Sequence, residues 1–514
     1  MSELLDKYDY QTLLAAETSA YPSPIPTQEV SNGEFMPNVQ NERQREFEAR
    51  LKDLGDRIAK KHGVSRRQFL KSVSGMAAAF VAMNEVYGNF FQVDKAEAAI
   101  PEMAAERAKS LSHQFIFDDH THFVRGDAPV DSPVRRFVNL RNNAAKVGLN
   151  PELAKETQTF EHIQFNNYVK EMFFDSDTKV VMLSGAPSDI PGDWFLTNRM
   201  KFDAREKINK MAGSKRQMFQ AVFTPGQPGW EEEMDRAIME LKPDSWKGYT
   251  IGDVNSLEKS KYPWRMDDEK IAYPVYEKMV KSGINIVCVH KGLFTESAAR
   301  KIPRMTEYAS VADVGKAAKD WPQLVFAIYH SGYRHQNDPD TATAEFDKSG
   351  RLAWVSDLAE IPGKFGVNNV YADLGAVFAS TSVTHPRLAA AMLGILIRGL
   401  GSDHVVWGTD SVWYGSPQWQ IEALRRLEIP PEMQKQHSFE PLGPADGLVK
   451  SAVFGYNSAR LYNLDLRTSM RQFENDRFAK LKKDYELAGA QRSNLAYGYI
   501  ARDRLKYREV IACH

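Results

Sequence analysis

Histidine residues with the spacing of a metal-ligand pair follow an apolar run near residue 115. The run Phe115-Ile116-Phe117 leads directly into Asp118-Asp119-His120-Thr121-His122. Residues i and i+2 of a β-strand lie on the same face, so we expect His120 and His122 to project together. Two imidazoles at that spacing can bind one side of a borderline-soft divalent ion.

Three later apolar runs also end on residues that bind metals or transfer protons. His290 and His330 each end a run rich in β-branched residues, and Asp410 closely follows the run Val405–Trp407. A single histidine at a strand end is more often a structural residue than a ligand. Four independent runs that end on His, His, His and Asp are hard to attribute to chance, and together they predict one shared site.

These residues share a site only if their strands meet at one end of the same sheet. From about residue 113 the sequence alternates short β-rich runs with helix-forming segments, which is typical of a parallel (β/α)8 TIM barrel. A doubly wound open sheet permits the same alternation, but it does not gather runs one, five, six and eight. The eight runs are Phe115–Asp119, Lys179–Leu183, Gln217–Phe223, Ser245–Ile251, Asn285–Val289, Leu324–Tyr329, Asn369–Asp373 and His404–Trp407.

The order of these motifs resembles the amidohydrolase superfamily. More narrowly, it is similar to the amidohydrolase-related branch that includes aminocarboxymuconate semialdehyde decarboxylase and related hydrolases. The local contexts that carry the likeness are Tyr329-His330-Ser331-Gly332, Trp407-Gly408-Thr409-Asp410 and the closing segment Tyr456–Tyr462. The resemblance covers about residues 113–465.

The resemblance implies a ligand set and two catalytic roles. His120, His122, His290 and Asp410 correspond to the ligands of one divalent ion, usually Zn²⁺. His330 corresponds to the histidine that polarises or protonates the substrate, and Asp410 also corresponds to the base that accepts a proton from the activated water. A bound Zn²⁺ lowers the pKa of its water to about 7, which supplies hydroxide at neutral pH.

Lys247 is the residue that decides between one metal ion and two. It lies in Ser245-Trp246-Lys247-Gly248-Tyr249, on the fourth run. In binuclear relatives a lysine on strand four is carboxylated and bridges two ions, whereas in the resembled branch it is structural or contacts the substrate. We expect one ion, with a second only if Lys247 is carboxylated.

Four further side chains are candidates for substrate binding, together with Lys247. Arg125, Lys291 and Arg334 follow ligand-bearing segments closely and could bind a substrate carboxylate. Trp413 follows Asp410 and could stack on a planar substrate. The alternative for each is a surface charge or a packed aromatic ring.

Three functions are compatible with these residues. The first is a metal-dependent hydrolase that uses a metal-activated water to cleave a C–N or C–O bond of a small organic substrate. The second is a non-oxidative decarboxylase of a planar or aromatic carboxylic acid. The third, a non-catalytic metal-binding protein, is disfavoured because the presence of both His330 and Asp410 exceeds what metal binding alone requires.

The regions outside the barrel carry a targeting signal and a tail. Residues 1–64 are expected to be polar and largely disordered, and residues 466–514 to form a helical extension. The run Ser65–Lys71 resembles the twin-arginine export signature, and an apolar run and the small-residue site Ala96-Glu97-Ala98 follow it. Residues 65–99 therefore predict export to the periplasm by the twin-arginine translocation machinery. The alternative is an ordinary amphipathic helix start.

Composition excludes several other classes of protein. The formal charge is −1, from 66 basic and 67 acidic residues, so the chain has no electrostatic signature of a nucleic-acid-binding protein. The two cysteines, Cys288 and Cys513, are too few for a disulfide framework or a cysteine-ligated zinc site. No apolar run is long enough for a membrane span. The helical tail is expected to pack around the barrel or against a partner subunit of a homo-oligomer.

Overall fold

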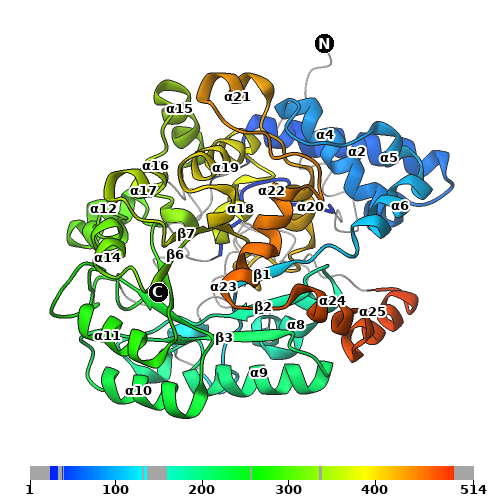
Figure 1. Ribbon diagram of the computed structural model, residues 1–514. Coiled ribbons are helices and arrows are strands. Elements are labelled where there is room, and N and C mark those ends of the chain that lie inside the picture. The colour runs from blue at the N-terminus through cyan, green and yellow to red at the C-terminus, as the bar shows by residue number, and fades with distance from the viewer. Residues whose placement is uncertain are drawn as a thin grey trace.

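A computed structural model describes residues 23–32, 38, 40–129, 132–135, 159–254, 257–334 and 338–490. Eight parallel strands form one sheet in sequence order, each beside the next, as expected for a (β/α)8 barrel. Figure 1 shows β1, β2 and β3 of this sheet side by side. The strands are β1 (Phe117–Thr121), β2 (Val180–Leu183), β3 (Gln217–Val222), β4 (Ser245–Tyr249), β5 (Ile286–His290), β6 (Val325–Tyr329), β7 (Val370–Asp373) and β8 (Val405–Val406).

The sheet closes where β8 and the residues after it reach β1. Asp119 N–H donates to the Trp407 carbonyl at 2.8 Å, and Asp410 N–H donates to the His120 carbonyl at 2.8 Å. An isolated parallel bridge joins Thr121 to Ser411. The structure therefore confirms the predicted TIM barrel and all eight of its strands.

Helices cover the outside of the barrel and connect its strands. They are α8 (Phe165–Val169), α9 (Asn198–Ala212), α10 (Trp230–Arg236), α11 (Tyr273–Ser282), α12 (Glu296–Lys301), α13 (Thr306–Ala309), α14 (Val314–Asp320), α15 (Pro339–Ser349), α16 (Val355–Ala359), α17 (Ile361–Phe365), α18 (Gly375–Thr381), α19 (Pro386–Leu400), α20 (Gln418–Arg426), α21 (Pro431–His437), α22 (Leu448–Ser451) and α23 (Asn457–Leu461). The strands that they cover are almost entirely buried, which explains their β-branched, apolar sequences.

An irregularity in β1 directs the histidines into the barrel. Asp118 pairs with Val181 but Thr121 pairs with Leu183, so two residues of β1 lie opposite one residue of β2. Such a bulge reverses the alternation of side chains beyond it. Phe117 packs inside the barrel, and after the bulge His120 also faces the interior although the two lie three residues apart.

The described part of the N-terminal region is folded, unlike the disorder expected for residues 1–64, whereas residues 1–22 lie outside the described residues. It forms α2 (Glu42–Lys61), α3 (Arg66–Leu70), α4 (Val73–Tyr87), α5 (Lys95–Ala99) and α6 (Pro101–Leu111), which gather at one side of the barrel (Figure 1). Residues 23–32 are also mostly buried. The polar composition concealed this order because α2 is amphipathic and buries only one face, which includes Phe47 and Leu51.

The predicted export segment is part of the folded structure. The small residues of α4 from Ala77 to Ala79 are completely buried, and Arg66 pairs with Asp56 at 2.9 Å. Its predicted cleavage site lies within α5. None of the described helices is both long enough and apolar enough to cross a membrane.

The tail forms two helices against the barrel. They are α24 (Leu466–Asn475) and α25 (Arg477–Leu487). Arg216, next to the start of β3, donates to Asp476 between the two helices at 2.7 Å, and Tyr485 donates to Asp175 at 2.7 Å. The helical tail that the sequence predicts is thus present as far as Leu487, and residues 491–514 lie outside the described residues.

Candidate metal centre

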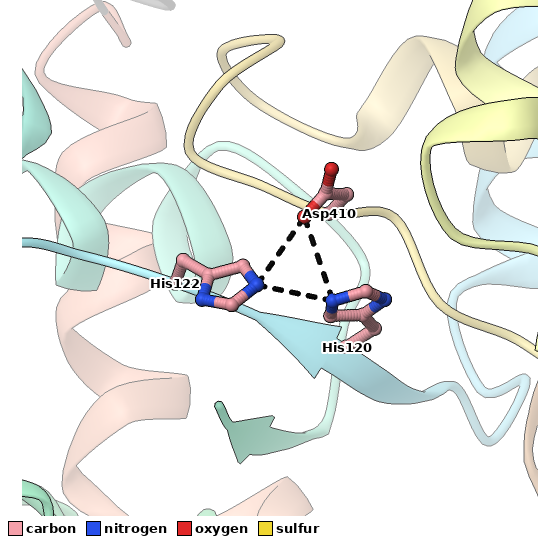
Figure 2. Close-up of side chains that lie close together, drawn as sticks. All are labelled: His120, His122 and Asp410. Atoms are coloured by element: carbon pink, nitrogen blue, oxygen red, sulfur yellow. Dashed lines mark hydrogen bonds and ion pairs between the residues drawn. The ribbon is translucent and has the colours of Figure 1, made fainter. Parts of the chain in front are cut away.

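Three predicted ligands converge at the barrel mouth. His120 Nε2 lies 3.0 Å from His122 Nε2, and Asp410 Oδ1 lies 3.5 Å and 3.3 Å from these two nitrogens (Figure 2). All three residues are buried. Ligands that bind a single ion tetrahedrally at roughly 2.0–2.1 Å lie about 3.3 Å apart, so this cluster fits a divalent ion.

Asp373, at the end of β7, orients His120. Its Oδ2 lies 3.1 Å from His120 Nδ1, on the opposite side of the ring from the cluster. Burial raises the pKa of Asp373 and lowers the pKa of His120. A carboxylate that holds the Nδ1 proton leaves Nε2 free to bind a metal. Asp373 was not among the predicted site residues, although it ends the seventh run.

A second carboxylate fixes the loop that carries Asp410. Asp118 accepts hydrogen bonds from Thr409 N–H at 3.0 Å and Thr409 Oγ1 at 2.5 Å, which ties β1 to the Gly408-Thr409-Asp410 segment. Asp410 has a φ of 56°, a conformation that residues with a side chain rarely adopt. The surrounding hydrogen bonds hold it there, as is common at functional sites.

His330 lies beside the cluster with its tautomer defined. Its Nδ1 accepts a hydrogen bond from Ala376 N–H, at the start of α18, at 3.2 Å. Burial lowers the pKa of His330, so the ring is neutral and carries its proton on Nε2. Its ring centroid is 4.8 Å from that of His120 and 4.7 Å from that of His290.

His290 is the predicted ligand that the structure does not bring into the cluster. Its ring stacks on Tyr249, with centroids 4.8 Å apart and planes at 19°. Among the described residues, the groups of potential ligands within 4.8 Å of one another are His120–His122–Asp410 and His120–His330–Asp373. In the second group the Nδ1 atoms of His120 and His330 already have partners, so it is a hydrogen-bonded network.

Lys247 lies in the barrel below these residues. It is completely buried, and its Nζ lies 3.5 Å from the centroid of the Tyr329 ring and 5.0 Å from that of Tyr249. An ammonium over an aromatic face is a favourable arrangement for a charged lysine. Burial and the charge of Lys247 both lower the pKa of His120.

A second buried lysine was not predicted. Lys201 of α9 is completely buried, and its Nζ would lie 3.1 Å from a Cβ added at Gly185, just beyond β2. Within the described part of the chain, this Nζ has no hydrogen-bond partner. Burial, Lys247 and Lys201 together lower the pKa of His122. No sequence signal distinguishes Lys201 from the other lysines of this helix.

Among the predicted substrate contacts, Trp413 lies at the cluster. Its ring stacks on His122, with centroids 5.9 Å apart and planes at 29°. Burial raises the pKa of Asp410 to about 7, although hydrogen bonds from Asn32 and Trp413 oppose this effect.

The three other predicted cations contact groups outside the cluster. Arg125 pairs with Asp127 at 2.7 Å, and Arg334 lies over the Trp354 ring. Lys291 differs most from the prediction, because its buried Nζ donates to Asp313 and to a backbone carbonyl, both at 2.8 Å. Residues alternate along β5, so inward-facing His290 directs the next residue away from the mouth.

Comparison with known sequences identifies one family. A family model described as Amidohydrolase matches residues 191–464, just over half of the chain. The match includes His290, His330 and Asp410 and begins after His120 and His122. A search of curated proteins finds no match.

Several solved structures resemble the chain at low identity. A 5-carboxyvanillate decarboxylase from Sphingomonas paucimobilis is 13% identical, with a TM-score of 0.39, over 68% of this chain and 100% of that one. A 2,6-dihydroxybenzoate decarboxylase from Rhizobium is 13% identical, with a TM-score of 0.39, over 68% and 99%. A 4-oxalomesaconate hydratase from Rhodopseudomonas palustris is 17% identical, with a TM-score of 0.37, over 73% and 100%.

Proposed function

Because the chain belongs to the amidohydrolase family, we propose that it is a divalent-metal-dependent enzyme that removes CO₂ from a small planar carboxylic acid. The observation that carries this proposal is the surroundings of the cluster formed by His120, His122 and Asp410. Aromatic rings and two buried lysines lie beside these ligands. Such surroundings suit a flat anion.

The metal ligands that we assign are His120, His122 and Asp410, with His290 as the predicted fourth. Imidazole nitrogens and a carboxylate oxygen suit Zn²⁺ and Mn²⁺ alike. When bound, a divalent ion supplies Lewis acidity that polarises the oxygen atoms of a substrate. We propose one ion per chain, because Lys247 Nζ lies where a charged ammonium is stabilised by the Tyr329 ring.

The shape of the proposed substrate follows from the aromatic rings. Trp413 stacks on His122, and Phe195 lies against Trp413 with ring centroids 5.6 Å apart. Tyr249 stacks on His290 at the other side of the site. Aromatic rings favour flat ligands because stacking buries both faces of the partner.

The charge of the proposed substrate follows from the lysines. Lys201 and Lys247 are completely buried, and both oppose protonation of His122. Burial also lowers the pKa of Lys201 itself, an effect that an anionic ligand beside it would oppose. Charges act more strongly in a buried site than in water. A bound divalent ion adds positive charge, so the site favours a carboxylate.

His330 is the proton donor that we assign. When the bond between a carboxylate and its neighbouring carbon breaks, CO₂ leaves and the electron pair remains on that carbon, which then takes a proton. His330 Nδ1 accepts the Ala376 N–H, so the proton available for transfer is on Nε2. Solvent water then restores that proton to the ring, and the hydroxide that remains combines with the released CO₂ as bicarbonate.

Hydrolysis is the second candidate. The sequence favours it over decarboxylation, and one observation still supports it. Asp410 lies beside both histidines, where its carboxylate could accept a proton from an attacking water. We rank it second because hydrolysis of a neutral amide or ester requires neither aromatic walls nor buried cations.

A substrate panel tests both candidates. The purified protein, loaded with Mn²⁺ or Zn²⁺, is incubated with planar aromatic acids, amides and lactones while CO₂ release and hydrolysis are measured separately. We expect CO₂ release from at least one acid, its loss in His120→Ala together with the metal, and a fall in kcat of at least about 100-fold in His330→Asn.

The panel also defines the contrary results. Hydrolysis without CO₂ release would support the second candidate. Metal binding without turnover of any compound would support a non-catalytic metal-binding protein. If His120→Ala kept its metal, the ligand set itself would be wrong.

A further inference from the structure

A segment from outside the barrel lies at the metal centre. Residues 23–32 precede α2, and Ile25 and Val30 are completely buried in the same hydrophobic core as the barrel helices. The segment ends at Asn32, which is 4% exposed. It lies outside the residues that match the amidohydrolase family.

Asn32 contacts a proposed metal ligand directly. Its Nδ2 donates a hydrogen bond to Asp410 Oδ2 at 3.0 Å. The other oxygen, Oδ1, is the one that lies 3.3 Å from His122 and 3.5 Å from His120. The two carboxylate oxygens therefore have separate partners, and Asn32 defines which of them faces the histidines.

We propose that Asn32 is a positioning residue of the metal centre and that residues 23–32 belong to the active site because they hold Asn32 against Asp410. This inference rests on the metal centre of the proposed function. A hydrogen bond to the outer oxygen of a ligating carboxylate prevents the group from rotating. Partners of this kind typically contribute 10- to 100-fold to metal affinity.

The N-terminal helices hold this segment in place. Glu48 of α2 accepts hydrogen bonds from Thr27 Oγ1 at 3.2 Å and from Gln40 Nε2 at 2.8 Å. Gln40 also donates to the Thr27 carbonyl at 3.3 Å. Thr27 and Gln40, which lie on either side of Asn32 in the sequence, thus both form hydrogen bonds to Glu48.

The segment reaches the residues that follow β8 through Asn32, which contacts Asp410. Burial raises the pKa of Tyr333, which follows β6, and the charge of Glu29 adds to this effect.

Metal titration of the full-length protein tests the role of Asn32. The dissociation constants of Mn²⁺ and Zn²⁺ are measured by calorimetry for the wild type and Asn32→Ala. The matched control is Asn84→Ala, which removes two hydrogen bonds between α4 and Phe91 in the same region. We expect Asn32→Ala to weaken metal binding about tenfold or more and the control to leave it unchanged.

Hydrogen exchange of the wild type provides a second test that requires no variant. Amides of residues 23–32 should become more protected when Mn²⁺ is added, whereas those of α25 should not change. Unchanged affinity in Asn32→Ala, or unchanged protection of residues 23–32 during metal binding, would overturn the inference. If His120→Ala binds metal as tightly as the wild type, the proposed metal centre fails instead.

Discussion

At the scale of single residues, close packing positions the histidines. A Cβ added at Gly408 would overlap Asp373 Oδ1 and lie 2.7 Å from His120 Cβ. A Cβ added at Gly375 would lie 2.6 Å from His330 Nδ1 and 2.8 Å from Asp373 Oδ2. Both glycines allow the backbone to approach the ring nitrogens and carboxylate that determine the tautomers.

Gly408→Ala tests this packing. The added methyl group must displace Asp373 or His120, so we expect the metal content of the purified protein to fall well below that of the wild type. Metal analysis and thermal unfolding measure the effect. The control is Gly363→Ala in α17, where an added Cβ meets nothing within 4 Å. A fully metal-loaded Gly408→Ala protein would contradict the role of Asp373.

At the scale of elements, strands of the barrel and a segment from outside it each contribute residues to the site. The bulge in β1 turns His120 inward, and β7 and β8 supply Asp373 and the loop of Asp410. The segment 23–32 adds Asn32 from outside the barrel.

Within that segment, burial raises the pKa of Glu29 to about 8, and the nearby Asp338 and Asp340 add to the effect.

The Glu29 carboxyl makes stability depend on pH. Between its ordinary pKa of 4.5 and about 8, the folded protein holds a proton that the unfolded chain releases. The free energy of unfolding should therefore fall as pH rises through this interval, by a few kcal/mol at most, since each pH unit contributes about 1.4 kcal/mol.

Chemical denaturation from pH 4.5 to 8 measures this effect. Glu29→Gln should flatten the dependence because the amide does not titrate. The control, Glu102→Gln, changes an exposed residue of α6 and should retain the wild-type slope. Equal slopes for Glu29→Gln and the wild type would show that Glu29 is charged in the folded protein.

At the scale of the whole molecule, the N-terminal helices and the barrel form one hydrophobic core. Two ion pairs join them: Arg426 of α20 binds Glu97 of α5 at 2.5 Å in a buried pair, and the partly buried Arg107 of α6 binds Glu422 at 3.1 Å. Glu97 lies within the predicted cleavage site. Export by the twin-arginine route remains a prediction. These contacts bear only on whether the N-terminal segment is cleaved off after export.

We predict that the mature protein retains its N-terminal helices. Cleavage after Ala98 would remove Glu97 and leave Glu422 as the acidic partner of the buried Arg426, which destabilises the folded protein. Intact-mass measurement of the protein from periplasmic and cytoplasmic fractions tests this expectation. A stable periplasmic chain that begins at Ala99 would contradict this prediction. If no form of the protein were found in the periplasm, the prediction of export would be wrong.

The sequence by itself determined the barrel and most of its mouth. Strands buried on both faces are continuous apolar runs, and polar residues that end such runs are visible without a structure, as with His120, His122 and Asp410. Asp373 is likewise a polar residue at the end of an apolar run, the seventh, but it was not predicted to belong to the site. The helical tail was also evident from its amphipathic spacing.

Only the tertiary structure decided which groups meet. The contact between Asn32 and Asp410 joins residues 378 positions apart, and no local pattern encodes it. Lys201 resembles a surface lysine until the packing of α9 buries it, and Lys291 resembles a substrate contact until Asp313 pairs with it. The buried N-terminal segment was missed because polar composition predicts disorder, whereas its few apolar residues bury themselves in a core formed by the rest of the chain.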